Sequence, residues 1–348
     1  MLLKELSEAR GVSGNEAAVR EIILQAVQDT IDEHRVDALG NLICTKKARR
    51  TPGDKTPRKV MVSAHMDEIG FIITGINGDG TLRFDDVGGI DGRVLLSKQV
   101  LVGDKQVPGV IGYKPPHLMS PSEWNSAPDT SKLAIDIGAT NKGGAEKLAQ
   151  VGDYVTFRTF FEVLDEGNLR TVKGKAFDDR AGCATLVELL KADYAFDLYA
   201  VFTTQEEVGL RGAKVAAYAV APDVAFALEG TICDDLPNDK DVSPVTEVGK
   251  GPAITFADRS MLADQRLVRL LVSTAKRLDI PYQFKRAVAG GTDSGAVHLA
   301  REGVPCVTVA IPTRYIHAPV SLLSLSDFDH TVQLVRESLL ALEGGLES

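Results

Sequence analysis

The stretch Leu198–Gly212, LYAVFTTQEEVGLRG, contains the pattern from which the rest of the chain can be interpreted. It begins as an apolar run of β-branched and aromatic residues, which is typical of a buried parallel strand. The run ends at Glu206 and Glu207, where open α/β sheets bind their ligands. Because consecutive side chains point in different directions, one glutamate could bind a metal while the other transfers a proton. A solvated acidic loop is the simpler explanation of an isolated pair, so the interpretation depends on the other motifs.

Length, charge and cysteine content exclude several classes of protein. A chain of 348 residues suggests one large core and a second module. The net charge of −9 argues against a nucleic-acid partner and against an anionic membrane surface. We find no secretory signal and no apolar run of membrane-spanning length. The four cysteines are scattered without metal-binding spacing. We therefore expect a cytoplasmic protein with reduced thiols.

Helices and strands alternate at both ends of the chain, which predicts an α/β fold whose mostly parallel sheet is flanked by helices. A hairpin with its turn at Gly40-Asn41 follows the first long helix, for which Asn15 or Ser13 could be the cap. Ser326 or Asp327 could cap the last helix. The predicted helices are 15–31, 179–192, 210–219, 262–279, 294–302 and 327–343, and the predicted strands are 59–64, 198–204, 223–229, 252–256, 282–286 and 305–311.

The segment 69–171 has a different sequence pattern from the rest of the chain. Six short β-type runs are separated by Gly and Pro and show little helical periodicity, which predicts a small β-barrel or sandwich. This module is inserted into an α/β domain formed by residues 1–68 and 172–348. The loop 114–130 is long for a packed domain, so we expect it to be mobile or to make an interaction.

Polar residues that can bind metals follow the buried strands or stand at turns beside them. Carboxylates and imidazoles that meet at one sheet edge would repel or stay unsatisfied unless a cation gathers them. A mixed set of His, Asp and Glu suits Zn²⁺, Co²⁺ or Mn²⁺ better than Ca²⁺ or Mg²⁺. Ligands that share one carboxylate are typical of a hydrolytic two-metal site. The candidates are His65, Asp67, Asp178, Asp179, Glu206, Glu207, Glu229 and His317.

Five motifs in order resemble the M42 family of dinuclear metallo-aminopeptidases, which includes glutamyl and TET aminopeptidases and proteins with endoglucanase or frv-operon names. The motifs are HMDEIGF (65–71), GKAFDDRAG (174–182), TTQEEVGLRGA (203–213), GGTDSGAVH (290–298) and PTRYIHAP (312–319). Each motif alone is of low or moderate specificity, but five in order are highly specific. The resemblance covers essentially the whole chain and implies a zinc-exopeptidase-like fold with an inserted β-barrel-like domain.

The resemblance also implies a role for each site residue. Glu206 would be the general base, which takes a proton from the attacking water and delivers it to the leaving amine. Asp67 would hold the second ring nitrogen of His65. Asp178 would bridge the two metals in preference to Asp179. The implied metal ligands are His65, Asp178, Glu207, Glu229 and His317. Many family members carry Asp at the position of Glu229, which leaves metal preference and substrate size open.

An activity and an assembly follow from the resemblance as well. It implies an aminopeptidase that removes N-terminal residues from peptides with two divalent ions per subunit, Zn or Co and possibly Mn. The family forms homodimers through the inserted module and commonly assembles them into tetrahedral homododecamers.

Several residues keep alternative interpretations. His65 and His317 could be core histidines, and Asp178 could cap the helix that follows it. Asp293 fits a helix N-cap, or the glycine-rich helix start at Gly291, Thr292 and Asp293 could bind the substrate main chain or its carboxylate. Arg259 could anchor an acidic side chain or pair with a nearby Asp.

Three other functions compete with an aminopeptidase. The first is a deacylase or amidase built on the same metals. The second is a glycosidase, which needs two carboxyls and leaves His65 and His317 without a role. The third is an inactive oligomeric metal-binding scaffold, against which the retention of Glu206 and of every expected ligand argues.

Overall fold

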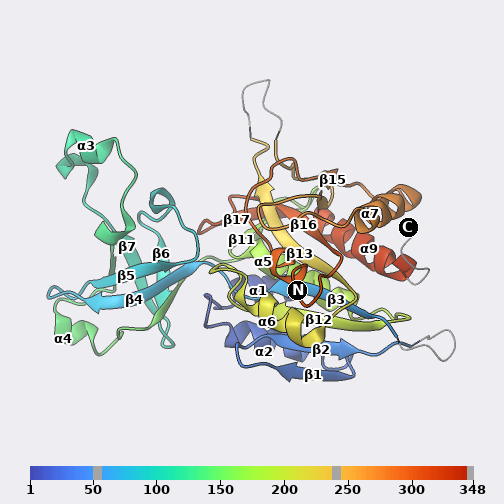
Figure 1. The fold of residues 1–348 in the computed structure, drawn as a ribbon. Helices are drawn as coiled ribbons and strands as arrows, with labels where there is room; N and C mark the ends of the chain where they lie inside the picture. The colour runs from blue at the N-terminus through green and yellow to red at the C-terminus, as the bar shows by residue number, and fades with distance from the viewer. Residues whose placement is uncertain (50–56, 237–243, 343–348) are drawn as a thin grey trace.

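The computed structural model describes residues 1–49, 57–236 and 244–342, which form one large sheet with helices on both faces and one closed barrel beside it (Figure 1). The strand order in the large sheet is β1-β2-β12-β3-β13-β16-β17-β11-β10, and β14 and β15 branch from β16. Its strands are β1 (Glu33–Val36), β2 (Leu42–Lys46), β3 (Lys59–His65), β10 (Glu162–Val163), β11 (Thr171–Gly174), β12 (Asp197–Thr203), β13 (Val224–Cys233), β14 (Ala253–Thr255), β15 (Gln283–Phe284), β16 (Cys306–Arg314) and β17 (Ser321–Ser324).

The four central strands β12, β3, β13 and β16 are parallel, as the alternation of helices and strands predicts. Both edges of the sheet are antiparallel. The predicted fold class is thus confirmed, and the hairpin at Gly40-Asn41 forms between β1 and β2. The parallel centre brings the carboxyl ends of four strands to one edge.

Alternate side chains of the central strands enter two cores on opposite faces of the sheet. Val60, Val62 and Ala64 of β3 pack into the larger core, whereas Met61 packs into the smaller one. The helices of the larger core are α1 (Leu2–Glu8), α2 (Ala17–Val27), α5 (Phe177–Leu189), α7 (Gln265–Leu278) and α9 (Leu325–Ala341), and those of the smaller core are α6 (Arg211–Val220) and α8 (Ser294–Val297).

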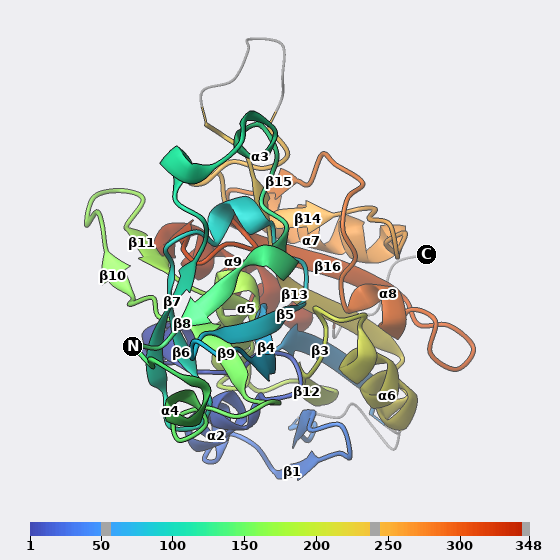
Figure 2. The same ribbon diagram turned by 90° about the vertical axis from the view of Figure 1, so that its left-hand side faces the viewer.

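All six predicted β-type runs of the inserted segment form strands, and these strands close into a barrel in the order β4-β5-β8-β7-β6-β9. Figure 2 looks onto this barrel in front of the large sheet. The rings of Phe84 and Phe157 pack edge-to-face on Phe71 in a core of its own. The strands are β4 (Gly70–Ile76), β5 (Leu82–Val87), β6 (Gln99–Val102), β7 (Val107–Gly112), β8 (Ala134–Asp136) and β9 (Tyr154–Phe157).

The loop 114–130 projects from the barrel as an arm (Figure 1). It carries the 3-10 helix η2 (Pro116–Leu118) and the helix α3 (Pro121–Trp124), and η3 (Thr130–Lys132) stands at its end. Trp124 is exposed. The other short helices of the barrel segment are η1 (Gly92–Val94) and α4 (Lys142–Ala145).

Several predicted caps and one predicted length are wrong. The hydroxyl of Ser324 caps α9 by accepting from the backbone N–H groups of Ser326 and Asp327, since β17 leads into the helix without a loop. The predicted end of this helix at 343 lies outside the described residues. No side chain caps α2, whose N-cap position is Glu16 rather than Asn15 or Ser13.

The helix expected at 294–302 has only four residues. Arg301 and Gly303 have left-handed φ angles of 56° and 100°, which a continuing helix cannot contain.

All four cysteines are buried and free. Within the described ranges, no helix has both the length and the apolar character needed to cross a membrane.

Candidate metal centre

The parallel centre of the sheet brings the predicted ligands to one edge. His65 is the last residue of β3, Glu206 and Glu207 follow β12, and Glu229 lies within β13. His317 follows β16, whose last residue is Arg314. Asp178 stands in the first turn of α5, which packs against β13. Five separate parts of the chain thus meet where sequence analysis predicts a site.

Two groups of potential ligands share one carboxylate. Ligand atoms of His65, Asp178 and Glu229 all lie within 4.8 Å of one another, and so do those of Asp178, Glu207 and His317. His65 Nε2 is 3.3 Å from Asp178 Oδ1 and 3.6 Å from Glu229 Oε2. His317 Nε2 is 3.7 Å from Asp178 Oδ2 and 3.4 Å from Glu207 Oε2. Each oxygen of Asp178 therefore faces a different group.

Both histidines are held by their other ring nitrogen. His65 Nδ1 lies 3.1 Å from the carbonyl oxygen of Asp67, and His317 Nδ1 lies 2.9 Å from that of Gly89. A carbonyl oxygen can only accept, so each Nδ1 carries a proton and each Nε2 faces the carboxylates. This is how metal-binding histidines are usually oriented. Because Gly89 follows β5, the barrel segment helps to position His317.

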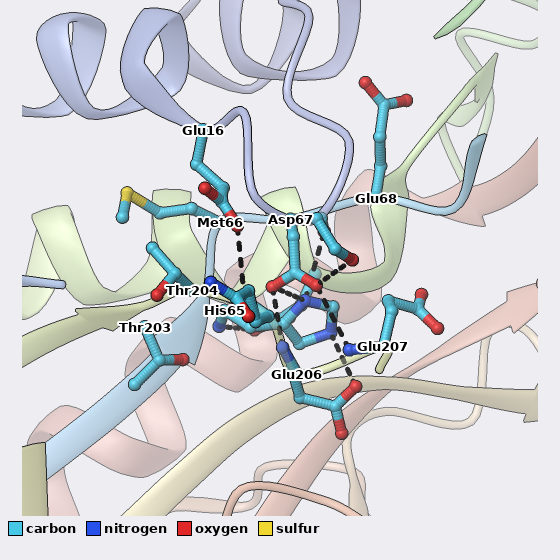
Figure 3. A network of polar contacts seen from close by, with 12 residues as sticks. Glu16, His65, Met66, Asp67, Glu68, Thr203, Thr204, Glu206 and Glu207 are labelled. Carbon is cyan, nitrogen blue, oxygen red and sulfur yellow. Dashed lines mark hydrogen bonds and ion pairs between the residues drawn. The ribbon is translucent and has the colours of Figure 1, made fainter. Parts of the chain in front are cut away.

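Asp67 connects β3, which ends at His65, to the turn after β12 that carries Glu206 and Glu207, here called the glutamate turn. Figure 3 shows the contacts that meet at the carboxylate of Asp67. Its Oδ1 accepts from the backbone N–H of Glu206 at 3.0 Å, and its Oδ2 accepts from that of Glu207 at 3.1 Å. Ser13 Oγ donates to Oδ2 at 2.6 Å. The carboxylate is also 3.5 Å from His65 Nδ1. Asp67 therefore fixes both the imidazole and the backbone of the two glutamates.

Asp178 and Asp179, which a cis peptide bond joins, have different surroundings. Gly230 N–H donates to Asp178 Oδ1 at 3.2 Å, and a Cβ at Gly230 would lie 2.8 Å from that of Asp178. Only glycine fits beside this carboxylate. Asp179 instead accepts from the backbone N–H groups of His65 and Gly182. It is thus Asp179, and not Asp178, that accepts from a backbone N–H of α5, that of Gly182. This contact replaces the capping role that sequence analysis left open for Asp178.

The site concentrates negative charge in a buried place. Burial, together with neighbouring carboxylates, raises the pKa values of Glu206, Glu207 and Glu229 well above the usual range. Burial alone would lower the pKa of His65, but hydrogen bonds with Asp178 and Asp67 raise it well above its ordinary value. Burial would likewise raise the pKa of Asp178, but the contact with His65 lowers it.

The donor set fits divalent cations. Within the part of the chain that the structure describes, no Lys or Arg lies within 4.0 Å of Asp178, Glu206, Glu207 or Glu229. Buried carboxylates without cationic partners are costly, and a divalent ion in each group would offset that cost. Imidazole and carboxylate ligands together suit Zn²⁺, Co²⁺ or Mn²⁺.

A cleft of about 570 Å³ opens beside the two groups. Gly291 and Thr292 line it, together with Glu206 and His317. The hydroxyl of Thr292 donates to Asp258, so this side chain already has a partner.

Asp293 and Arg259 do not line the cleft. Asp293 stands at the N-cap position of α8, but its side chain makes no cap hydrogen bond. It accepts instead from Thr203 Oγ1, and its backbone N–H donates to Glu229. The side chain of Arg259 is exposed, and its backbone N–H donates to Gly290.

Sequence analysis missed the supporting residues of the site. Ser13 was expected to cap a helix but donates to Asp67. Glu16 accepts from the backbone N–H of Gln205 at 3.2 Å. Neither residue belongs to one of the five motifs, and only the approach of the N-terminal segment to the glutamate turn reveals their role.

Comparison with known proteins shows the family of the chain. The family model described as M42 glutamyl aminopeptidase matches residues 40–334. The chain belongs to this M42 peptidase family. A lysyl aminopeptidase from Pyrococcus furiosus is 33% identical over 352 residues, which cover 98% of this chain and 97% of the relative. As a member of the M42 family, the chain is a peptidase.

Two solved structures extend the similarity to the whole fold. A TET aminopeptidase from a marine-sediment Thaumarchaeota archaeon matches with a TM-score of 0.92 and 38% identity, covering 98% of this chain and 96% of that one. The Pyrococcus horikoshii TET1 peptidase, which can assemble into a tetrahedron or a large octahedral shell, matches with a TM-score of 0.83 and 36% identity, covering 97% and 98%.

Proposed function

We propose that the chain is a metal-dependent aminopeptidase that removes N-terminal residues from peptides. The observation that carries the proposal is the pair of ligand groups that share Asp178 at the mouth of a cleft. His65, Asp178 and Glu229 would hold one divalent ion, and Asp178, Glu207 and His317 would hold the other. Zn²⁺, Co²⁺ and Mn²⁺ suit these donors. When bound, such a pair supplies an activated water at neutral pH and polarises the scissile carbonyl.

Glu206 is the general base of the proposed reaction. It lines the cleft, belongs to neither ligand group, and its Oε2 lies 4.0 Å from His65 Nε2. Asp67 holds its backbone N–H, so the carboxylate projects from a fixed turn. Burial raises the pKa of Glu206, which makes its carboxylate a stronger base toward water and lets the resulting acid return the proton to the leaving amine. Asp67 acts as a positioning residue.

The proposal for substrate orientation follows from the ligand groups. A free α-amine can bind to a divalent ion, and Asp178, Glu207, Glu229 and His317 of the two groups line the cleft. The N-terminus of a peptide would enter this end of the cleft. The stretch Gly291–Thr292, which lines the cleft, would contact the peptide main chain.

We also propose that residues 69–171 form a dimerisation domain and that cytoplasmic homodimers assemble into a tetrahedral homododecamer. The barrel has a core of its own and carries an exposed arm with Leu118 and Trp124 at its surface. Solvent exposure of two large apolar side chains on one arm supports a contact there. Sedimentation or mass photometry of the full chain would test this, because a monomer at micromolar concentration would exclude it.

Release of the N-terminal residue from aminoacyl-p-nitroanilides tests the proposed activity. The protein would be stripped with chelator and reloaded with Zn²⁺, Co²⁺ or Mn²⁺ at two equivalents per chain. We expect activity to vanish on chelation and to return with metal. N-acyl amino acids would be tested in parallel. Hydrolysis of these compounds without turnover of any aminoacyl substrate would replace the aminopeptidase with a deacylase. Metal binding without turnover of either class would favour an inactive scaffold.

A further inference from the structure

Lys285 is a buried cation on the wall of the same cleft. It follows β15 directly, is only 6% exposed and lines the cleft together with Glu206 and Glu229. Its ammonium group donates to the carbonyl oxygen of Ala289 at 2.9 Å. Sequence analysis did not single out this residue, because an isolated lysine at the end of a short strand gives no signal.

The ammonium group of Lys285 has no anionic partner in residues 1–49, 57–236 and 244–342. The structure gives it one hydrogen bond, to Ala289, although an ammonium group has three N–H donors. A buried ammonium without a carboxylate partner is costly, and the other buried lysines of the described chain avoid that cost. Lys175 pairs with Glu68, and Lys46 pairs with Asp193.

The position of Lys285 relative to the ligand groups follows from the sheet. The strands β13, β16, β14 and β15 lie side by side, and Glu229 of β13 is opposite Ala310 of β16, which is opposite Ala253 of β14. Three strand spacings therefore separate Glu229 from Gln283, which is about 14 Å between backbones, and Lys285 follows two residues after Gln283. The long side chains of Glu229 and Lys285 both reach the cleft and shorten this gap.

The cleft is thus lined by the proposed metal ligands and by a buried ammonium group beside the loop 289–292. A free amine can bind to a metal ion held by the ligands, and a carboxylate can bind to the ammonium group. A ligand that makes both contacts has a free amine and a carboxylate a few bonds away. Peptides with an acidic N-terminal residue have this arrangement, and so do very short peptides with a free C-terminus.

We propose that Lys285 binds a carboxylate of the substrate and so determines specificity. The carboxylate belongs either to an N-terminal Asp or Glu side chain or to the C-terminus of a short peptide. This inference rests on the proposed aminopeptidase activity. Arg259, for which sequence analysis left open both an acidic side chain and a nearby Asp as partner, is exposed and outside the cleft lining, so we assign the carboxylate to Lys285.

Turnover by the metal-loaded full chain separates the two sources of the carboxylate. The ratio of kcat/KM for Glu-p-nitroanilide to that for Ala-p-nitroanilide reports on the side-chain carboxylate. The ratio for Ala-Gly to that for Ala-Gly-amide reports on the C-terminal carboxylate. Loss of a charged hydrogen bond should lower kcat/KM about 10- to 100-fold for the carboxylate-bearing member of the pair in Lys285→Met. Lys285→Arg should retain most of the discrimination, and Lys285→Glu should invert it toward Lys-p-nitroanilide.

Matched controls distinguish specificity from structure. Lys276→Glu changes net charge equally on an exposed position of α7 and should leave both ratios unchanged. A merely structural role of Lys285, through its bond to Ala289, would lower kcat/KM for all substrates by the same factor. If Lys285→Met lowers kcat/KM by the same factor for both members of each substrate pair, the inference is wrong.

Binding measured by calorimetry keeps the inference separate from the proposed reaction. Metal-loaded protein would be titrated with Glu-Ala-Ala-amide, Gln-Ala-Ala-amide and the dipeptide Ala-Gly with its amide. One outcome is that no substrate turns over, but a carboxylate-bearing ligand binds more tightly than its amide counterpart and Lys285→Met abolishes this difference. In that case only the proposed reaction fails. If turnover is normal and these preferences are absent, only the role of Lys285 fails.

Discussion

Two clusters of buried charge stand on either side of one chain segment, and they are built in opposite ways. Asp67 and Glu68 are neighbours after β3, and Figure 3 shows their side chains pointing to different sides. On one side lie the ligand groups, whose carboxylates are not matched by Lys or Arg among the described residues. On the other side both carboxylate oxygens of Glu68 accept from the ammonium group of Lys175, at 2.6 and 2.7 Å, and Arg180 lies 3.5 Å away.

The difference indicates which cluster is structural and which binds a ligand. Arg180 is fully buried and donates to backbone carbonyls of Leu6, Ala9, Gly11 and Met66, so its charge joins the N-terminal segment to the sheet. Glu68 also accepts from Thr156 of the barrel strand β9. Glu68, Lys175 and Arg180 form a paired cluster, in which the protein itself supplies the opposite charges. The ligand groups and Glu206 form an unmatched cluster, which needs cations from outside. The predictions below test this contrast.

The largest effect is expected at Glu206. Glu206→Gln removes the proton acceptor and should lower kcat about 10²- to 10⁴-fold. Metal content measured by atomic emission should remain at two ions per chain, since Glu206 belongs to neither ligand group. Glu207→Gln is the matched control, because the same chemical change one residue away should lose one ion. Undiminished activity of Glu206→Gln would remove it from the mechanism.

Breaking the paired cluster should lower the free energy of unfolding and leave kcat largely unchanged. Lys175→Met leaves Glu68 buried with a weaker partner, and loss of one member of a buried ion pair costs about 3–5 kcal/mol. Urea unfolding should show this loss with and without metal. Glu207→Gln should have the opposite effect on metal-free protein, because it removes a repelling carboxylate. Equal destabilisation by both changes would contradict the contrast.

The pH dependence of metal-free stability gives a third test. The pKa values of Glu206, Glu207 and Glu229 are raised by burial, and that of His65 is raised by its carboxylate partners. The folded state therefore binds more protons than the unfolded state above the ordinary Glu value of 4.5, so stability falls as pH rises.

Melting temperatures in chelator should accordingly decrease from about pH 5 to about pH 8. Added metal should raise the melting temperature more at the higher pH, because cations compete with protons for the same groups. A metal-free protein that is most stable at pH 8 would show that the carboxylates are already neutralised.

The smallest effect is expected at Ser13, which reaches across to the unmatched cluster. Ser13→Ala removes one of three donors to the Asp67 carboxylate and should cost about 1–2 kcal/mol of stability. We expect a modest decrease in kcat, because the backbone N–H groups of Glu206 and Glu207 still hold Asp67. Calorimetry and steady-state kinetics would measure both values. A loss of activity as large as that of Glu206→Gln would mean that Asp67 depends on Ser13 alone.

Sequence patterns predicted the elements of this fold well because periodicity is local. The six short runs of the inserted segment all became strands. Leu198–Phe202, which is buried except for the half-buried Tyr199, lies in β12, one of the four parallel central strands. Apart from the hairpin at Gly40-Asn41, the antiparallel edges were not predicted, since strand direction depends on how the chain returns. The cap of α9 at Ser324 was missed because Asp327, a better cap by residue type, accepts instead from Gly249 and Gly251.

The same distinction holds for the site. The residues that lie at strand ends, such as His65 and Glu207, could be identified from motif and position. The contacts of Ser13, Glu16 and Lys175 could not, because each joins segments that are distant in sequence. The position of Lys285 in the same cleft as Glu206 and Glu229 also became visible only when these segments were brought together.

The spread of the ligands along the chain has a consequence for how the protein matures. His65 ends β3, whereas His317 follows β16 and stands 252 positions further along the chain. The group of Asp178, Glu207 and His317 cannot form until synthesis has passed His317. A nascent chain that ends before this point would therefore lack a ligand of the proposed centre and could not cut peptides around it.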